Sequence, residues 1–456
     1  MKEIQGSSIL ILGYGHEGRS THRYIATKYP DIKVGIADQK EEIVPVAGSS
    51  VSLHLGANYL DSISNYETII RSPGISIQAL QLQKALEAGK HITSETNLFL
   101  AEVPGMVIGI TGTKGKSTTA SLIAHILRTS YQDVRLIGNI GEPALDHLAD
   151  ATYNTVFVAE LSSHQLEDVR YSPHIAVVLN IVPEHLDYYG DFERYMQAKS
   201  NIVKFQKNED VVIFNPSHEI VSNICENALS EKVKFSAKEG DEFTCFVKNG
   251  QIFIREDDSI YPLIFINELP IKGPGNLENA LAAATTTSLF KISIDKIQNA
   301  LRDFAPLNHR LESAGEYKGV KFYNDSLATI PEAVINALEA LGKDVETLIA
   351  GGFDRGLDFT ILGRYLSKKQ IKTLILFPET GQKLWSALCQ FIKEGERPQK
   401  YEVKTMEDAV QIAFEVTKPG KICLLSPGAS SFGIFKDYVD RGNTFKKLIK
   451  EIGESF

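Results

Sequence analysis

The sequence predicts an α/β protein with three domains, each built on a mainly parallel sheet. At 456 residues the chain is too long for one ordinary core. Short apolar runs that end in glycine or a polar residue alternate with stretches of helical period, the pattern of doubly wound sheets covered by helices. We expect a Rossmann-like domain over residues 1–103, a central P-loop domain over 104–306 and a doubly wound domain over 307–456.

Composition narrows the class of protein. Apolar residues make up 43% and charged residues 23% of the chain, as in soluble globular proteins. No apolar run is long enough to span a bilayer, and the four scattered cysteines have no metal-site spacing. The net charge of −9 disfavours a nucleic-acid partner. We therefore expect a cytoplasmic protein, a monomer without membrane or nucleic-acid partners.

The first domain begins with a strand at Ile9–Gly13, followed by a helix from about Glu17 and a strand at Lys33–Asp38. Gly13-Tyr14-Gly15-His16-Glu17-Gly18 precedes Asp38 with the spacing of a dinucleotide fingerprint, in which the acid meets a ribose. This pattern leaves three interpretations open: an NAD-dependent dehydrogenase, a uridine-nucleotide site, or a feature of the fold alone.

The second domain contains the most specific motif. A strand at Val107–Ile110 runs through Gly112-Thr113-Lys114-Gly115-Lys116-Ser117-Thr118 into an apolar helix, so that backbone amides and a helix N-terminus can hold phosphate. The spacing departs from the usual P-loop, because Gly109 stands six positions before Gly115. We expect Lys116 to neutralise phosphate charge and Ser117 to bind Mg²⁺.

Two further strand ends of this domain carry candidate metal ligands. Glu160 ends the strand at Thr155–Glu160, and Glu184-His185-Leu186-Asp187 follows the strand at Ile175–Asn180. A carboxylate near a phosphate loop suits Mg²⁺, which prefers oxygen ligands. Lys199 lies in a helix predicted over Phe192–Lys204, where composition alone predicts a solvated position.

The segment from Glu209 to Pro270 has short alternating runs and predicts a smaller β-rich part. A polar connector at Ala305-Pro306-Leu307-Asn308 marks the next domain boundary. Beyond it we predict the strands Val320–Tyr323, Thr347–Ala350, Thr373–Phe377 and Ile422–Leu425. Polar turns follow several of these strands, at the edge where open α/β sheets bind ligands.

Together these motifs resemble the Mur ligases of peptidoglycan synthesis. The resemblance is carried by Gly112 to Thr118, Glu160-Leu161-Ser162-Ser163, Pro183 to Asp187, Lys199, Gly275 to Ala280, His309-Arg310, Asn324-Asp325-Ser326 and Leu425 to Gly428. Their order matches over nearly the whole chain. The N-terminal fingerprint and the ending Ser430-Ser431-Phe432 through Arg441-Gly442 are most similar to the glutamate-adding branch.

The resemblance implies ATP, Mg²⁺ at two sites, UDP-N-acetylmuramoyl-L-alanine and glutamate as ligands. It assigns catalytic roles to Lys116, His185, Lys199 and Arg310. The implied metal ligands are Ser117, Glu160, His185 and a carbamylated Lys199. ATP would contact Gly112 to Thr118, Asn276, Asn279, Arg310 and Asp325. The uridine substrate would contact His16, Glu17, Asp38, Gly74, Asn139, Ser162 and Gln165. The incoming amino acid would contact Thr329, Arg355, Ser431, Phe432 and Tyr438.

One residue departs from the family pattern. Leu327 stands where the D-glutamate-adding branch usually has a lysine that contacts the substrate carboxylate, and we expect Arg355 to compensate. D-glutamate remains the leading substrate, with L-glutamate as its rival. Three further functions stay open at this point: a folylpolyglutamate-type ligase, a dehydrogenase and a non-catalytic nucleotide sensor.

Overall fold

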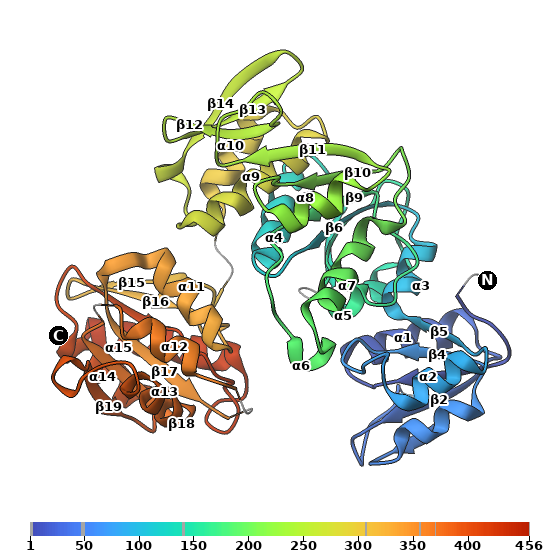
Figure 1. The fold of residues 1–456 in the computed structure, drawn as a ribbon, viewed down its shortest axis with the longest axis horizontal. Helices are drawn as coiled ribbons and strands as arrows, with labels where there is room; N and C mark the ends of the chain where they lie inside the picture. Colours follow the sequence, from blue (N-terminus) through green and yellow to red (C-terminus); the bar gives the residue numbers. More distant parts are fainter. Residues whose placement is uncertain are drawn as a thin grey trace. The chain divides into compact units, whose positions relative to one another are not determined.

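The computed structural model describes residues 3–46, 51–138, 142–305, 308–354, 357–369 and 371–455, without the side chains of Asp187, Glu332 and Asn336. The described chain contains three sheets. It divides into two compact units, one of residues 1–269 with 276–304 and the other of residues 270–275 with 305–456. The first unit holds two of the sheets, and the second holds the third (Figure 1).

The first sheet is parallel throughout and has the strand order β3-β2-β1-β4-β5. The order starts in the middle and continues outward in both directions, as in a Rossmann-like half. Its strands are β1 (Ser8–Leu12), β2 (Lys33–Asp38), β3 (Val51–Leu55), β4 (Thr68–Arg71) and β5 (His91–Ser94). The helices of this part are α1 (His16–Lys28), α2 (Leu80–Glu87), α3 (Glu95–Glu102) and the 3₁₀ helix η1 (Tyr59–Asn65).

The second sheet has nine strands in the order β14-β13-β12-β11-β10-β9-β6-β8-β7. Its parallel part comprises β6 (Met106–Thr111), β7 (Val134–Gly138), β8 (Val156–Glu160), β9 (Ile175–Val178), β10 (Val211–Phe214), β11 (Glu231–Ser236) and β12 (Cys245–Lys248). The antiparallel strands are β13 (Gln251–Glu256) and β14 (Ser259–Phe265). The helices are α4 (Lys116–Leu127), η2 (Ala144–His147), α5 (Ser163–Leu166), α6 (Leu186–Tyr189), α7 (Phe192–Lys204), α8 (Glu219–Glu226), η3 (Ile266–Glu268), α9 (Pro274–Ser288) and α10 (Ile294–Asp303).

The β-rich character predicted for residues 209–270 is present, but these strands do not form a separate small sheet. Strand β10 pairs with β9, and β11 to β14 continue outward from β10, so they extend the sheet that carries the phosphate loop. The alternating runs predict strands correctly, because side chains of successive residues point to opposite faces. Which sheet a strand joins depends on long-range pairing, which these runs do not encode.

The third sheet has the order β15-β16-β20-β17-β18-β19. Only the edge strand β15 is antiparallel to its neighbour. The strands are β15 (Glu312–Tyr317), β16 (Val320–Asn324), β17 (Val345–Gly352), β18 (Thr373–Glu379), β19 (Gln399–Glu402) and β20 (Ile422–Leu425). The helices are α11 (Pro331–Leu341), η4 (Gly342–Asp344), α12 (Thr360–Leu366), α13 (Thr380–Cys389), η5 (Glu394–Glu396), α14 (Met406–Val416) and α15 (Tyr438–Glu454).

Helices cover both faces of this third sheet. Leu348 of β17 belongs to a core shared with α11, α12 and α13, whereas the next residue, Ile349, belongs to a core shared with α14 and α15. This alternation explains why the strands are apolar throughout, since both faces are buried. The predicted α/β class with doubly wound sheets is therefore confirmed. The predicted boundaries at residues 103 and 306 remain a proposal.

Among the described residues, no helix is both long and apolar enough to cross a membrane.

Candidate active site

The phosphate loop lies between the central strand β6 and helix α4. Gly112 and Gly115 have φ of 150° and 87°, which side chains other than glycine rarely adopt. A Cβ on Gly115 would also lie 2.3 Å from Oδ1 of Asn279. The amide of Thr113 donates to the backbone oxygen of Asn180 (2.6 Å). The loop is therefore fixed by its neighbours before any ligand binds.

Two lysines of the loop have different surroundings. Nζ of Lys116 donates to the backbone oxygens of Gly112 and Thr113, at 3.1 Å each. Lys114 forms an ion pair with Glu184 (2.7 Å). Burial opposes the ionisation of Glu184, but Lys114 outweighs it and holds the pKa of this carboxyl below its usual value. These two bonds hold Nζ of Lys116 at the backbone of the loop, where backbone amides and a helix N-terminus can bind phosphate.

The start of α4 and the ends of neighbouring strands supply candidate metal donors. Ser117 and Thr118, in the first turn of α4, are buried. Glu160 is 1% exposed and ends β8, which pairs directly with β6. His185 follows β9 on the other side of β6 and leaves about half of its side chain exposed. These are the positions expected for ligands at the carboxyl edge of a parallel sheet.

Lys199 is buried, which contradicts the solvated position predicted from composition. It lies on α7 with 2% exposure, and Nζ donates to the backbone oxygen of Gly112 at 2.7 Å. Nζ also lies 4.9 Å from the ring centre of Tyr195, one helical turn earlier. Burial, and next the charge of Lys116, lower the pKa of Lys199 well below its usual value. Burial therefore disfavours the charged form of this amine.

Helix α9 supports the loop from a third direction. Oδ1 of Asn279 accepts a hydrogen bond from Thr119 of α4 (3.2 Å). Nδ2 of Asn279 donates to Oδ1 of Asn276 (3.1 Å). The two asparagines are thus hydrogen-bonded to the start of α4, directly after the phosphate loop.

The first sheet contributes the opposite side of the site. Oδ2 of Asp38 accepts from the amide of Tyr14 in the glycine fingerprint (2.6 Å). Glu17, on α1, accepts a hydrogen bond from Nε2 of Gln165 on α5 (2.8 Å). This bond connects a helix of the first sheet with a helix of the second. Burial raises the pKa of Glu17 to about 7. Ser162 caps α5 through a capping box with Gln165, and this cap fixes the orientation of Gln165.

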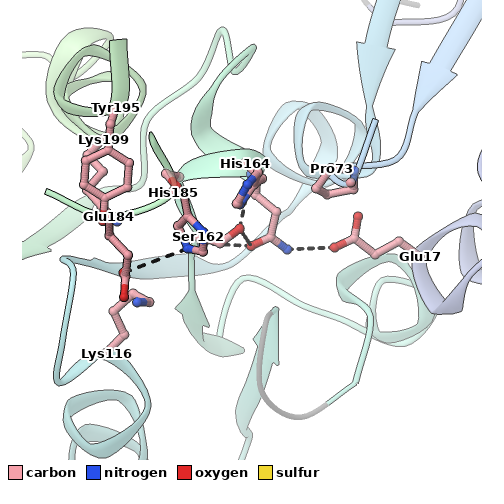
Figure 2. A pocket seen from close by; sticks show the side chains of 12 residues that line it. Glu17, Pro73, Lys116, Ser162, His164, Glu184, His185, Tyr195 and Lys199 are labelled. Atoms are coloured by element: carbon pink, nitrogen blue, oxygen red, sulfur yellow. Dashed lines mark hydrogen bonds and ion pairs between the residues drawn. The ribbon is translucent and has the colours of Figure 1, made fainter. Parts of the chain in front are cut away.

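A cavity of about 380 Å³ connects these groups, and Figure 2 shows it with Lys116, Glu184 and Lys199 on one side and Glu17 and Pro73 on the other. It lies entirely within the first compact unit. Its lining comprises Glu17, Pro73, Gly74, Lys116, Ser162, Ser163, His164, Gln165, Glu184, His185, Tyr195 and Lys199. His16 is exposed and does not line the cavity, and Asn139 lies outside the described residues.

Five of the lining residues lie outside the site assignments that the resemblance implies: Pro73, Ser163, His164, Glu184 and Tyr195. Glu184 pairs with Lys114, and Tyr195 shares a hydrogen bond with Thr113 (3.0 Å). The ring of His164 lies 4.9 Å from that of His185. Tyr195 could have been found, because residues four apart on a helix face the same side and Lys199 was already singled out. His164 has no comparable signal.

The amino-acid and remaining ATP candidates lie in the second unit. Asp325 follows β16, and its carboxylate accepts from Ser426 Oγ (2.8 Å) and the amide of Leu311 (3.1 Å). Burial raises its pKa to about 7. Arg310 is half-buried, Ser431 is buried, and Phe432 and Tyr438 are exposed. Thr329 lies between β16 and α11, and Arg355 lies outside the described residues.

No group of three or more His, Cys, Asp or Glu side chains in the described part of the chain is placed to hold a metal ion. The candidate donors near the loop are Glu160 and His185, with the hydroxyl of Ser117. The oxygens of Glu160 and Ser117 are hard donors that fit Mg²⁺, which commonly keeps water and phosphate oxygens as its other ligands; His185 would add a nitrogen donor.

Family models match all three parts of the chain. The N-terminal domain described as Mur ligase MurD-like matches residues 7–94. The Mur ligase middle domain matches residues 110–287. The Mur ligase glutamate ligase domain matches residues 309–428.

Full-length relatives and solved structures agree with these matches. A UDP-N-acetylmuramoylalanine–D-glutamate ligase of Caldanaerobacter subterraneus is 35% identical, covering 99% of both chains. One of the same name from Geobacillus kaustophilus is also 35% identical, covering 98% of both. The UDP-N-acetylmuramate-alanine ligase MurC of Thermotoga maritima is 16% identical with a TM-score of 0.59, covering 98% of this chain and 99% of that one. The MurF ligase of Thermotoga maritima, solved with ADP, is 18% identical with a TM-score of 0.59, covering 99% and 97%. These two structures share the fold.

Proposed function

The chain belongs to the Mur ligase family, and we propose that it is an ATP-dependent ligase that joins D-glutamate to UDP-N-acetylmuramoyl-L-alanine. The observation that carries this proposal is the cavity, which is lined both by the phosphate-loop residue Lys116 and by Glu17 and Gly74 of the N-terminal domain. A uridine substrate held by the first sheet could therefore present its carboxylate to a nucleotide held by the loop. The full-length relatives give no support to a dehydrogenase.

The chemistry would proceed through an acyl phosphate. An oxygen of the substrate carboxylate attacks the γ-phosphorus of ATP, the bond to the bridging oxygen breaks, and ADP leaves. The amine of glutamate then attacks the acyl carbon to give a tetrahedral intermediate, which expels phosphate and loses a proton from nitrogen. The chain mainly contributes positioning and charge neutralisation, as in phosphoryl transfer generally. Lys116 would stabilise the transferring phosphate, and Arg310 and Asp325 would orient the nucleotide.

Mg²⁺ would be held by Ser117, Glu160 and His185, and when bound it would neutralise charge on the phosphates. Glu160 is buried beside the loop, where its charge would be balanced by such a cation. The candidate second site depends on Lys199. A neutral Lys199 amine can attack CO₂, forming an N–C bond and releasing a proton to give a carbamate. The pKa of Lys199, lowered by burial, supports this step.

The amino-acid end of the reaction is proposed from motif position. Leu327 cannot contact a carboxylate, and we assign that contact to Arg355, supported by Thr329, Ser431, Phe432 and Tyr438. A carboxylate left without its charged partner would lose roughly 1.5 to 3 kcal/mol. The D configuration follows the names of the full-length relatives.

Phosphate release tests the proposal directly. The purified chain is given ATP, Mg²⁺ and UDP-N-acetylmuramoyl-L-alanine, separately with D-glutamate, L-glutamate and neutral amino acids. We expect turnover with D-glutamate that requires both other substrates. Turnover with L-glutamate but not D-glutamate would contradict the assigned configuration and leave the ligase activity standing. Turnover with neither isomer would contradict the proposed function.

A further inference from the structure

The described chain buries two arginines completely, Arg71 and Arg441, which have the largest side chains among its fully buried residues. Arg71 has acidic partners. Its guanidinium lies 2.9 Å from Asp168 and 3.5 Å from Glu167. Burial opposes its charge, but Asp168 outweighs that effect and keeps the pKa of Arg71 above its usual value. The charge of Arg71 is thus balanced within the protein.

Arg441 has no such balance. Its three hydrogen bonds go to neutral oxygens: Nε donates to Ser326 Oγ (3.0 Å), Nη2 to the backbone oxygen of Ser326 (2.8 Å) and Nη1 to that of Ala429 (3.1 Å). Among the described residues, it forms no ion pair with a carboxylate. Burial lowers its pKa to about 10, so it still carries its charge at neutral pH.

The nearby acids are engaged elsewhere. Asp437 accepts from the amide of Asp440 (2.8 Å), and Asp440 accepts from the amide of Lys436 (3.1 Å) at the start of α15. Asp325 accepts from Ser426 and Leu311. These three carboxylates are therefore held by other groups and do not supply a counter-charge to Arg441.

The position of Arg441 explains why an unbalanced charge could be useful there. Ser326 follows β16 and Ala429 follows β20. A Cβ built on Gly352, the last residue of β17, would lie 3.5 Å from Nη1 of Arg441. Strands β16, β20 and β17 are neighbours in the sheet, so the guanidinium lies under the carboxyl edge of three adjacent parallel strands. Ligands of open α/β sheets bind at this edge.

From this placement we propose that Arg441 is a specificity-determining residue whose buried charge favours an incoming amino acid with an acidic side chain. Burying a charge without a counter-charge is costly. An anionic ligand at the strand edge would supply the missing counter-charge when it binds. The inference deepens the proposed function and rests on it.

Arg441 would act on the ligand through its electrostatic field and without direct contact, because only 1% of the residue is exposed. The strength of this interaction depends on the net charge of the ligand. Glutamate carries one more negative charge than glutamine, which has nearly the same shape. A unit charge acting over roughly 8 to 10 Å at an effective dielectric constant of about 20 changes affinity by about 15- to 30-fold. The charge of Arg441 should therefore contribute a preference of about this size.

The test compares glutamate with glutamine as the amino-acid substrate, through the ratio of their kcat/KM values. Arg441→Gln keeps hydrogen-bonding capacity but removes the charge, and we expect the ratio to fall about 15- to 30-fold, mainly through a higher KM for glutamate. Arg441→Lys keeps the charge, and we expect most of the preference to remain. An unchanged ratio in folded Arg441→Gln would overturn the inference, as would an equal fall in both variants.

Two controls separate an effect of the Arg441 charge from a general effect of the substitution and from a failure to fold. Arg364→Gln makes the same change on an exposed residue of α12 and should leave the ratio within about twofold. If Arg441→Gln does not fold, Arg441→Lys is the deciding variant. A retained preference for glutamate over glutamine supports a role for the charge of Arg441, and a lost preference excludes it. Wild-type turnover is measured first, since its absence would contradict the proposed function and not the role of Arg441.

Discussion

Nζ of Lys199 donates a hydrogen bond to the backbone oxygen of Gly112, at 2.7 Å, so a buried amine on α7 lies directly against the phosphate loop. Burial lowers its pKa, which favours the neutral amine, the form that reacts with CO₂. A carbamate there would replace a cation with an anionic oxygen ligand for a hard metal.

If this lysine carries a carbamate, Lys199→Ala should reduce turnover at least about 10²-fold, since charge stabilisation at the transferring phosphate is lost. Added acetate or formate should restore part of it by supplying the missing oxygens. Lys204→Ala, on the exposed side of the same helix, is the control and should behave as wild type. Full activity of Lys199→Ala without additives would exclude the carbamate.

The charge of Lys116 should be essential for the phosphoryl step. Its Nζ contacts backbone oxygens of Gly112 and Thr113 and would move to phosphate when ATP binds. Lys116→Ala should reduce kcat by about 10²- to 10³-fold, measured by phosphate release. Lys207, which is 75% exposed, provides a control, and Lys207→Ala should have no effect. Near wild-type kcat in Lys116→Ala would remove the loop from the mechanism.

Gly115→Ala should weaken nucleotide binding. The new Cβ would meet Oδ1 of Asn279 at 2.3 Å, and Asn279 is held by Thr119. Gly250 also has a positive φ, of 74°, but open space around it. Gly250→Ala is therefore the control, because it introduces the backbone strain of about 1 kcal/mol without a steric clash. We expect a rise of at least about tenfold in the Kd for ATP only in Gly115→Ala, measured by calorimetry; equal affinity in both variants would contradict the steric argument.

The pKa of Glu17 predicts a pH-dependent stability. Its folded value of about 7 lies above the ordinary value of a glutamate, so the folded state binds this proton more tightly than the unfolded state. The stabilisation that protonated Glu17 provides is complete below about pH 4.5 and is lost as the pH rises to about 7, by at most about 3 kcal/mol. Solvent around the carboxylate reduces this figure.

Glu17→Gln removes the titration and keeps an oxygen that can accept from Gln165. In urea unfolding, the wild type should lose stability relative to Glu17→Gln between pH 4.5 and 7, with no further change above that range. Gln165→Leu should leave Glu17 without its donor and push the transition to higher pH. Parallel stability curves for wild type and Glu17→Gln would show that Glu17 does not titrate in this range.

Local patterns determined much of the fold and part of the site. The helix predicted over Phe192–Lys204 is present with those bounds, since Asp191 caps its first turn and its apolar residues recur with helical period. The strand before the phosphate loop and the loop itself were also predictable. Short-range rules govern these features: glycine allows the required φ, and a parallel strand buried on both faces must be apolar.

Only the tertiary structure decided which polar residues are buried and what compensates them. Lys199 and Lys204 are both lysines of one helix, yet one is buried against Gly112 and the other exposed. The Glu17 contact joins residues 148 positions apart. Arg71 and Arg441 look alike in sequence, but acidic partners surround only the first. The free energy of a buried charge depends on the groups around it, and distant parts of the chain bring those groups together.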